Sequence, residues 1–394
     1  MKRPERLWQP YLPKNVYDPY PMYDRLRDEG GLYKDITGSW IATRYDTVRF
    51  LLTDEHFKTQ IPNHKFHTKQ ASYSTRVMDA WILLREGQVH KRLRGVATNV
   101  IDWQGIEAIV QEVVDQNLAP LKSKSAIDAV KDIALLTPTR IITRILGLPI
   151  QDAPRCKSWA GVLLWAVNPY ITPQKLALVE QNAREFATYL DGILDQCEKE
   201  RPDSAIARLL NTPDDDGNYM TREEVISFVI FLYTSGEETV VNFIGNAIYA
   251  LLKAPDKMAA LAADPSLINI ATEELLRLDS SLQYSIRFAS VDIEVEGEKI
   301  RKGDLVIPVI GAANRDPEVF EDPHQINFKR KKYNHLTFGV GRHYCFGARL
   351  ARIESRAVLK GFAENLSHFR LDALVKRNPN IMFRGFKALP LKAV

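Results

Sequence analysis

Apolar residues along this chain recur mostly every three or four positions, which is the period of an amphipathic helix. One such stretch, 20–29, stops at the pair Gly30-Gly31, a typical C-terminal helix cap. Prolines break the longest helical region into pieces at 138, 149, 154, 169 and 173. The pattern predicts helices at 20–29, 46–52, 87–208 in several pieces, 221–252, 256–279 in two pieces, and 348–363.

Strand-like alternation is confined to short segments separated by turn residues. Gly297 and Gly303 are the turns between two of them, and a short hairpin is expected at 384–391. The segment 57–80 has no clear period, and a loop of that length in a compact domain usually carries function. The fold class is therefore mainly α with a small β portion, with strands at 32–35, 39–43, 292–296 and 305–310.

The helix predicted at 221–252 begins with a capping box, Thr221-Arg222-Glu223-Glu224, and contains no proline. At 1.5 Å per residue it is about 48 Å long, enough to cross the core. Its centre, 234–239, reads Thr-Ser-Gly-Glu-Glu-Thr. A glycine costs about 1 kcal/mol inside a helix, and a buried unpaired carboxylate is unfavourable. Either this is a functional site, or the two glutamates lie on a solvated edge of an ordinary helix.

Length and composition bound the class of protein. The chain has 394 residues, 45% of them hydrophobic and 26% charged, which suits a soluble globular protein with a large core. No repeat or linker divides it, so a single domain, 1–394, is predicted. A net charge of +4 does not indicate nucleic acid. Three cysteines at unrelated spacings suit a reducing compartment, and no 18-residue apolar run is present. We expect a cytoplasmic protein without a membrane anchor.

Cys345 lies in a loop punctuated by Gly339, Gly341 and Gly347, directly before the helix at 348–363. Amides of such a turn at a helix N-terminus stabilise an anion, and a thiolate placed there can ligate a metal. A buried structural cysteine is one alternative. Zinc would need further Cys or His nearby, whereas the other two cysteines are distant in sequence. A nucleophilic cysteine with a base brought in by the fold also stays open.

The loop resembles the haem-ligand loop of cytochrome P-450, Phe-x-x-Gly-x-[His/Arg]-x-Cys-x-Gly. The resemblance extends along nearly the whole chain and implies the cytochrome P-450 fold, with the long central helix over the haem. It implies heme b (iron protoporphyrin IX) ligated by the Cys345 thiolate, which favours cleavage of a bound O–O bond. The matching positions are Phe338, Gly341, His343, Cys345 and Gly347.

The centre of the long helix is similar to the family's oxygen-activating motif, Ala-Gly-x-[Glu/Asp]-Thr. By this resemblance Gly236 lets the helix pass close to the haem, while Thr239 and Glu238 handle protons. Two positions depart from the family pattern: Ser235 replaces the usual Ala or Gly, and Glu237 replaces a His found in many bacterial members.

Other residues gain a role only through this resemblance. Glu274 and Arg277 match the family's Glu-x-x-Arg pair and are expected to form a structural ion-pair network, with Arg330 as a third member. Cations are needed for the two haem propionates. The resemblance assigns that role to His90, Arg94, Arg287 and His343.

Basic residues after the ligand recur at spacings of three and four, which puts them on one helical stripe. A solvated helix face explains such a stripe. The alternative is a docking face for a separate ferredoxin or flavodoxin with its reductase, because the chain is too short to carry its own redox domain. We expect that face to include Lys91, Arg349, Arg352, Arg356 and Lys360, with the basic run at 329–332 on the same side.

The resemblance predicts a bacterial-type, monomeric haem-thiolate monooxygenase that uses O2 and two external electrons. Its apolar small-molecule substrate would be hydroxylated, epoxidised, dealkylated or coupled. A haem-binding sensor or carrier without turnover is the alternative. A cationic loop at 64–76 prompts the hypothesis of a substrate anion, against a plain solvated loop. The substrate-pocket residues expected from family position are Trp81, Tyr233, Ser235, Ile286 and Phe386.

Overall fold

The computed structural model describes residues 7–59, 73–79, 81–163, 165, 172–201, 204–331 and 333–394. Tertiary contacts divide the chain into two compact units. Unit 1 consists of Met1–Lys58, Val114–Leu135 and Thr239–Val394, and unit 2 of Thr59–Val113 and Leu136–Glu238. The long helix α11 (Arg222–Lys253) begins in unit 2 and ends in unit 1. The single domain predicted over 1–394 stays a prediction.

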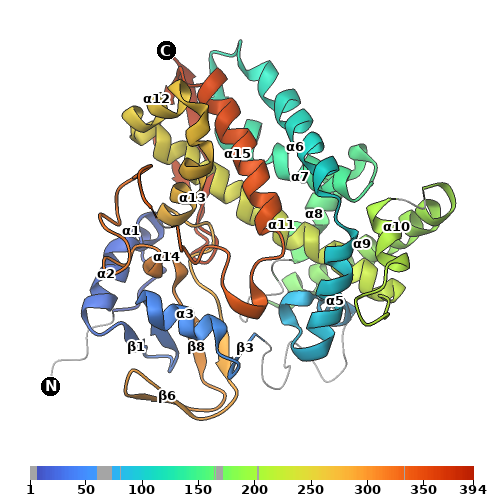
Figure 1. Ribbon diagram of the computed structural model, residues 1–394, viewed down its shortest axis with the longest axis horizontal. Helices are drawn as coiled ribbons and strands as arrows, with labels where there is room; N and C mark the ends of the chain where they lie inside the picture. Colours follow the sequence, from blue (N-terminus) through green and yellow to red (C-terminus); the bar gives the residue numbers. More distant parts are fainter. Residues whose placement is uncertain are drawn as a thin grey trace. The chain divides into compact units, whose positions relative to one another are not determined.

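One part of unit 1, formed by its N-terminal residues together with residues 287–313, is built on a five-stranded sheet (Figure 1). Its strands lie in the order β1-β2-β8-β5-β3, and β2 pairs parallel with β8. Apolar side chains such as Val48 and Val306 are fully buried in the cluster around the sheet. The elements are α1 (Pro13–Tyr17), α2 (Tyr20–Asp28), β1 (Leu32–Lys34), β2 (Trp40–Ala42), α3 (Tyr45–Thr53), β3 (Phe57–Lys58), β5 (Arg287–Ala289), β6 (Ile293–Val295), β7 (Glu298–Ile300), β8 (Leu305–Pro308) and α14 (Ile310–Ala313).

The rest of unit 1 is mainly helical, and α15 packs against α12 and α13 (Figure 1). Gly361 of α15 allows close packing, since a Cβ there would lie 2.6 Å from Leu118. The elements are η2 (Ala119–Leu121), β4 (Ala126–Asp128), η3 (Ala129–Ala134), α12 (Pro255–Ala263), η6 (Pro265–Leu267), α13 (Ile268–Leu278), η7 (Gly341–His343), α15 (Ala348–Asn365), β9 (Phe369–Leu371), β10 (Lys376–Arg377), β11 (Phe386–Ala388) and β12 (Pro390–Ala393).

Unit 2 consists of helices packed around aromatic side chains. Trp159 stacks on Phe186 at 5.1 Å between ring centroids, and Phe186 meets Tyr233 edge-on at 5.7 Å. Its elements, some shared with unit 1, are α4 (Tyr73–Asp79), η1 (Ile82–Leu84), α5 (Gly87–Val100), α6 (Trp103–Leu118), α7 (Leu136–Ile145), η4 (Ile150–Asp152), α8 (Ala153–Leu163), α9 (Pro173–Glu200), α10 (Ala205–Asn211) and the first half of α11.

The capping box at the start of α11 is confirmed. The Thr221 amide donates to Glu224 Oε2 at 2.9 Å, and the Glu224 amide donates to Thr221 Oγ1 at 3.2 Å. Met220 and Val225, on either side of the box, are both buried. Within the described part of the chain, no helix combines the length and apolar character needed to cross a bilayer.

Two expectations about secondary structure were wrong. The segment 384–391 is not a hairpin, because β11 pairs with β10 while β12 pairs with β4 and β9. The strand β4 interrupts the helical region predicted at 87–208. The predicted breaks at Pro138, Pro154 and Pro173 are confirmed, because these prolines lie in the first turns of α7, α8 and α9, where proline is tolerated.

Candidate active site

The Cys345 loop of unit 1 is held by its own backbone. The Cys345 amide donates to the Phe338 carbonyl at 2.8 Å, and the Gly339 amide donates to Leu336 at 2.8 Å. Gly339 and Gly341 have φ angles of +68° and +77°, a region that other residues adopt only with strain. A Cβ at Gly341 would also lie 3.3 Å from the Thr53 side chain. Glycine is therefore required at 341 by both conformation and space.

Cys345 is exposed and belongs to no disulfide. It lies three residues before Ala348, the first residue of α15, so it sits at the positive end of an 18-residue helix. A Cβ built on Gly347 meets nothing within 4 Å. Cys156 and Cys197 are instead fully buried, and burial raises the pKa of Cys156 to about 12. The loop thus presents one exposed cysteine beside open space, which fits a haem iron ligand.

The residues around Cys345 bear on the alternative of a zinc site. Among the residues that the structure describes, no group of three or more His, Cys, Asp or Glu is arranged to hold a metal ion. A structural zinc site takes four protein ligands. The described residues around Cys345 therefore do not support zinc, whereas a haem needs only one protein ligand here.

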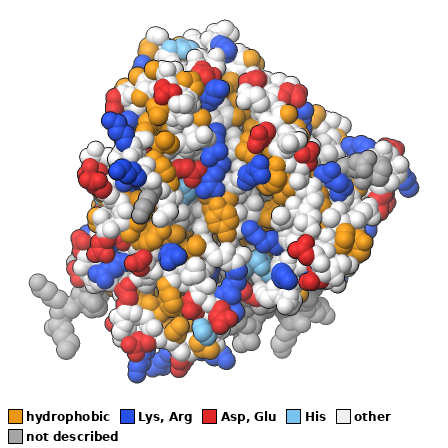
Figure 2. Space-filling view, in the orientation of Figure 1, with side chains coloured by type: hydrophobic (Ala, Val, Ile, Leu, Met, Phe, Trp, Pro, Cys, Tyr) orange, Lys and Arg blue, Asp and Glu red, His pale blue; other side chains and the backbone are white. Residues whose placement is uncertain are grey.

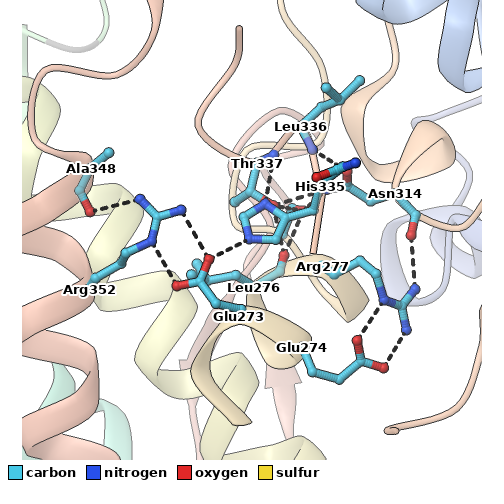
Figure 3. Close-up of polar contacts among 12 residues, drawn as sticks. Glu273, Glu274, Leu276, Arg277, Asn314, His335, Leu336, Thr337, Ala348 and Arg352 are labelled. Atoms are coloured by element: carbon cyan, nitrogen blue, oxygen red, sulfur yellow. Dashed lines mark hydrogen bonds and ion pairs between the residues drawn. The ribbon is translucent and has the colours of Figure 1, made fainter. Parts of the chain in front are cut away.

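The start of the loop is tied to α13 by buried polar side chains (Figure 3). Asn314 Oδ1 accepts from the Leu336 amide at 2.6 Å, and Asn314 Nδ2 donates to Thr337 Oγ1 at 2.9 Å. Thr337 Oγ1 in turn donates to the Leu276 carbonyl of α13 at 2.9 Å. These contacts fix where the loop leaves the body of unit 1.

The structure brings Glu274, Arg277 and Arg330 together (Figure 3 shows the first two). Arg277 donates to both Glu274 oxygens at 2.9 and 2.8 Å, and Arg330 adds bonds of 2.9 and 3.2 Å. Burial alone would raise the pKa of Glu274, but these bonds from Arg277 and Arg330 hold it below its usual value. Arg277 also donates to the Asn314 carbonyl at 2.9 Å, which links this network to the loop anchor.

The expectation that the whole basic run 329–332 contributes to the docking face was wrong for Arg330. Its side chain is 7% exposed because it points inward to Glu274. Lys332 lies outside the described residues.

A second carboxylate, Glu273, was missed by the sequence analysis. It accepts two bonds from Arg352 at 2.7 and 3.0 Å, one from Arg356 at 3.4 Å, and lies 3.1 Å from His335 Nε2 (Figure 3). Burial raises its pKa, but His335 and Arg352 outweigh that effect and lower the pKa to about 2. The Arg352 guanidinium also lies 4.3 Å from the ring centre of Phe338, so it braces the loop.

These contacts place two members of the expected docking face in ion pairs. Arg352 and Arg356 turn toward Glu273 instead of projecting only into solvent. Lys91 lies 3.5 Å from Asp216 and Lys360 lies 3.9 Å from Glu364, both at exposed positions. Figure 2 shows basic and acidic side chains interspersed on the visible face rather than one uniform basic field. Docking of a redox partner here stays a prediction.

The centre of α11 has an unusual exposure pattern for a helix that is otherwise mostly buried. Gly236 is exposed and Glu238 and Thr239 are half-buried. A Cβ on Gly236 would meet nothing within 4 Å. The Ser235 hydroxyl donates to the Phe231 carbonyl at 2.6 Å, so its proton is engaged within the helix. The helix is therefore open at Gly236, which fits the expected close approach of haem.

The four cations predicted for the propionates are divided between the units. His90 and Arg94 lie one turn apart on α5 in unit 2, and His90 is buried. In unit 1, Arg287 is buried on β5 and donates to Ser285 Oγ at 2.7 Å and to the Ile286 carbonyl at 2.8 Å. His343 is half-buried in η7, two residues before Cys345. Their roles toward haem stay predictions.

Two of the predicted pocket residues are packed into the interior. Tyr233 is 0% exposed, and its hydroxyl lies 2.5 Å from Thr143 Oγ1, because it projects from α11 toward α7 and α9. Phe386 is covered by the Arg377 guanidinium at 3.7 Å and the Tyr249 ring at 4.9 Å. The structure therefore gives Tyr233 and Phe386 packing roles, contrary to the expectation.

A pocket role for Trp81, Ile286 and Ser235 stays a prediction. Trp81 is buried, with its ring 5.7 Å from that of Phe231 on α11. Ile286 and Ser235 are half-buried. Most of the cationic loop at 64–76, namely 64–72, lies outside the described residues.

Comparison with known proteins agrees with this site. The family model "Cytochrome P450" matches residues 158–393. The chain is 31% identical over 388 residues to the cytochrome P450 monooxygenase PikC of Streptomyces venezuelae, covering 95% of this chain and 91% of the relative. It is 32% identical over 385 residues to the vitamin D(3) 25-hydroxylase of Pseudonocardia autotrophica, covering 95% and 93%.

A solved structure shows the same fold. P450BioI, crystallised in complex with hexadec-9Z-enoic acid ligated to acyl carrier protein, superposes with a TM-score of 0.89 at 28% identity, covering 97% of this chain and all of that chain. The chain belongs to the cytochrome P450 family. It is a monooxygenase acting on a small organic substrate, with the haem-iron cofactor of that family. The predicted family, fold class and enzyme class are confirmed.

Proposed function

We propose that this monooxygenase holds heme b through the Cys345 thiolate and inserts one oxygen atom of O2 into a C–H bond of an apolar small molecule. The observation that carries the proposal is the exposed Cys345 in its glycine loop at the N-terminus of α15. The open side of α11 at Gly236 supports it independently. Bound haem would supply the oxygen activation, favoured by a thiolate ligand.

The protein's own contribution at the sulfur is to stabilise negative charge. Amides at the start of α15 and in the loop lower the free energy of the thiolate relative to the thiol. The network of Asn314, Thr337 and Glu274 with its two arginines keeps the loop in one conformation. A rigid loop holds the sulfur in place without reorganisation when electrons arrive.

On α11, Thr239 and Glu238 are proposed to hold and move protons. Both are half-buried, so each can exchange protons with solvent while staying beside the open side of the helix. The Thr239 hydroxyl would hold a proton where oxygen is activated. The Glu238 carboxylate would then resupply that proton from solvent. His90, Arg94, Arg287 and His343 are proposed to bind the haem propionates.

Electrons are proposed to come from a separate ferredoxin or flavodoxin with its reductase, since family members use such partners. The basic side chains Lys91 and Arg349 are proposed to contribute to its docking. We further propose a cytoplasmic monomer, in keeping with three cysteines that form no disulfide. The fatty acyl group on the P450BioI partner and the substrate named for the vitamin D(3) hydroxylase support an apolar substrate here.

The proposal is tested with purified holoprotein, a surrogate ferredoxin and its reductase, and a panel of fatty acids, terpenoids and aromatic acids. A spin-state shift on binding identifies the substrate class, and product is then quantified per NADPH consumed. Thr239→Ala should release peroxide in place of product, because the proton held at the oxygen site is lost. The matched control is Thr234→Ala on the same helix, whose hydroxyl donates to Ile230 at 2.8 Å. Equal coupling in wild type and Thr239→Ala would contradict the proposal.

A further inference from the structure

Glu237 of α11 is a buried carboxylate immediately next to the proposed proton relay. Its residue exposure is 8%, and it lies between Gly236 and Glu238 in the sequence. The Thr139 hydroxyl of α7 donates to Glu237 Oε1 at 2.9 Å, and the Lys157 ammonium of α8 forms an ion pair with the same oxygen. All of these residues belong to unit 2.

The ammonium of Lys157 is also shielded from water, although its hydrocarbon stem is partly exposed. The Lys157 nitrogen is buried, and in the described part of the chain Glu237 is its acidic partner. A single charge removed from solvent is strongly unfavourable, whereas a buried ion pair compensates both charges. Loss of either side chain would therefore leave one uncompensated charge beside the centre of α11.

The groups that reach Glu237 come from three helices. They are Lys157 from α8, the Thr139 hydroxyl from α7, and the carboxylate of Glu238 on α11 itself. Burial raises the pKa of Glu237 above its ordinary value, Lys157 and Thr139 oppose that rise, and Glu238 adds to it. Because electrostatic coupling is reciprocal, the charge at Glu237 acts equally on Glu238.

We propose that Glu237 and Lys157 form a positioning pair for the monooxygenase reaction, whose balanced charge sets how readily Glu238 takes up and releases a proton. The inference rests on the proposed role of Glu238 as proton relay. Neither residue of the pair needs to touch the substrate or the haem. With both charges present, the formal charges of the pair cancel next to Glu238.

The charge-balance proposal predicts opposite effects for the two halves of the pair. Glu237→Gln leaves the Lys157 ammonium alone, which favours ionised Glu238 and lowers the pH at which it loses its proton. Lys157→Met leaves the Glu237 carboxylate alone, which disfavours ionised Glu238 and raises that pH. Each shift should be on the order of one pH unit, the usual size for a single nearby charge. The double variant restores neutrality and should return to the wild-type value.

The measurement is a pH titration of the protonated-carboxyl infrared band in resting holoprotein, with Glu238→Gln used to assign the band of Glu238. It needs neither substrate nor electrons. The pH profile of product formed per NADPH is recorded on the same proteins. Lys157→Arg keeps the charge and should keep the wild-type midpoint, which tests the proposal even if Lys157→Met does not fold. Glu112→Gln is the matched control, because it breaks the exposed 2.7 Å ion pair with Arg144 on α7.

Opposite shifts in the single variants, with restoration in the double variant and none in Glu112→Gln, support the pair as proposed. Coincident midpoints, or shifts in the same direction, overturn it and leave the pair a structural role only. A wild-type protein that titrates as expected but yields no product with any substrate would instead contradict the proposed function. The two failures are therefore distinguishable.

Discussion

Replacing Glu354 by Gln tests how the buried carboxyl group on α15 contributes to stability. Glu354 is 2% exposed, and within the described residues its Oε2 is buried without a hydrogen-bond partner. Burial, which disfavours the charged form, raises the pKa of this carboxyl from 4.5 to about 8. Folded protein at neutral pH therefore carries a protonated acid at this position, whereas the unfolded chain carries a carboxylate.

The sign of the pH dependence follows from linkage. Because the folded pKa is the higher one, the stability associated with Glu354 is fully present below pH 4.5 and is lost as pH rises through about 8. The loss is about 1.4 kcal/mol per pH unit over that range, or roughly 5 kcal/mol in all. Gln has nearly the same shape and does not titrate, so Glu354→Gln should lack this loss. Its stability relative to wild type should therefore increase with pH.

The assay is urea denaturation of wild-type and variant holoprotein, followed by far-ultraviolet circular dichroism, at several pH values from about 5 to about 8. Taking the difference between the two proteins cancels the other titrating groups. Glu364→Gln on the same helix is the matched control, because its side chain is exposed and only lies 3.9 Å from Lys360. A difference between wild type and Glu354→Gln that stays constant with pH would refute the reasoning.

Three further changes follow from the same structure. Arg277→Met should lower the free energy of unfolding by about 3–5 kcal/mol, measured in urea, because it leaves Glu274 in a buried site with one cation fewer; an unchanged midpoint would contradict this. Gly341→Ala should destabilise the protein by about 1–2 kcal/mol and weaken haem retention on gel filtration, because φ is +77° and the new Cβ would lie 3.3 Å from the Thr53 side chain. Thr239→Ala should lower product per NADPH by about tenfold or more while NADPH oxidation continues; retained coupling would count against the proton role.

Much of the helical fold can be predicted from the sequence because its signals are local. The capping box at Thr221 and the glycine pair after α2 act within a few residues of the helix end that they define. The pairing of β4 with β12 cannot be predicted in this way. β4 has three residues with only Ile127 buried, and its partner lies at the far end of the chain. Its existence depends on a tertiary contact rather than on local propensity.

The same distinction holds for the site. The loop from Phe338 to Gly347 is contiguous, so its residue types and spacing are visible in the sequence. Glu273 was missed because its partner Arg352 is 79 residues away, and the basic stripe on α15 does not reveal which members turn inward. Tyr233 was misassigned for a related reason, since helical spacing shows which residues share a face but not which neighbour that face meets.

The most direct test of the central claim is the absorption spectrum of the reduced protein with carbon monoxide, for wild type and Cys345→Ser. Cys345 as the haem ligand predicts that wild type shows the red-shifted Soret band of a thiolate-ligated ferrous carbonyl and that Cys345→Ser lacks it. Cys197→Ser, which changes a buried cysteine of α9, serves as the control and should keep the band. A thiolate band that survives in Cys345→Ser, or no haem binding in wild type, would contradict the assignment.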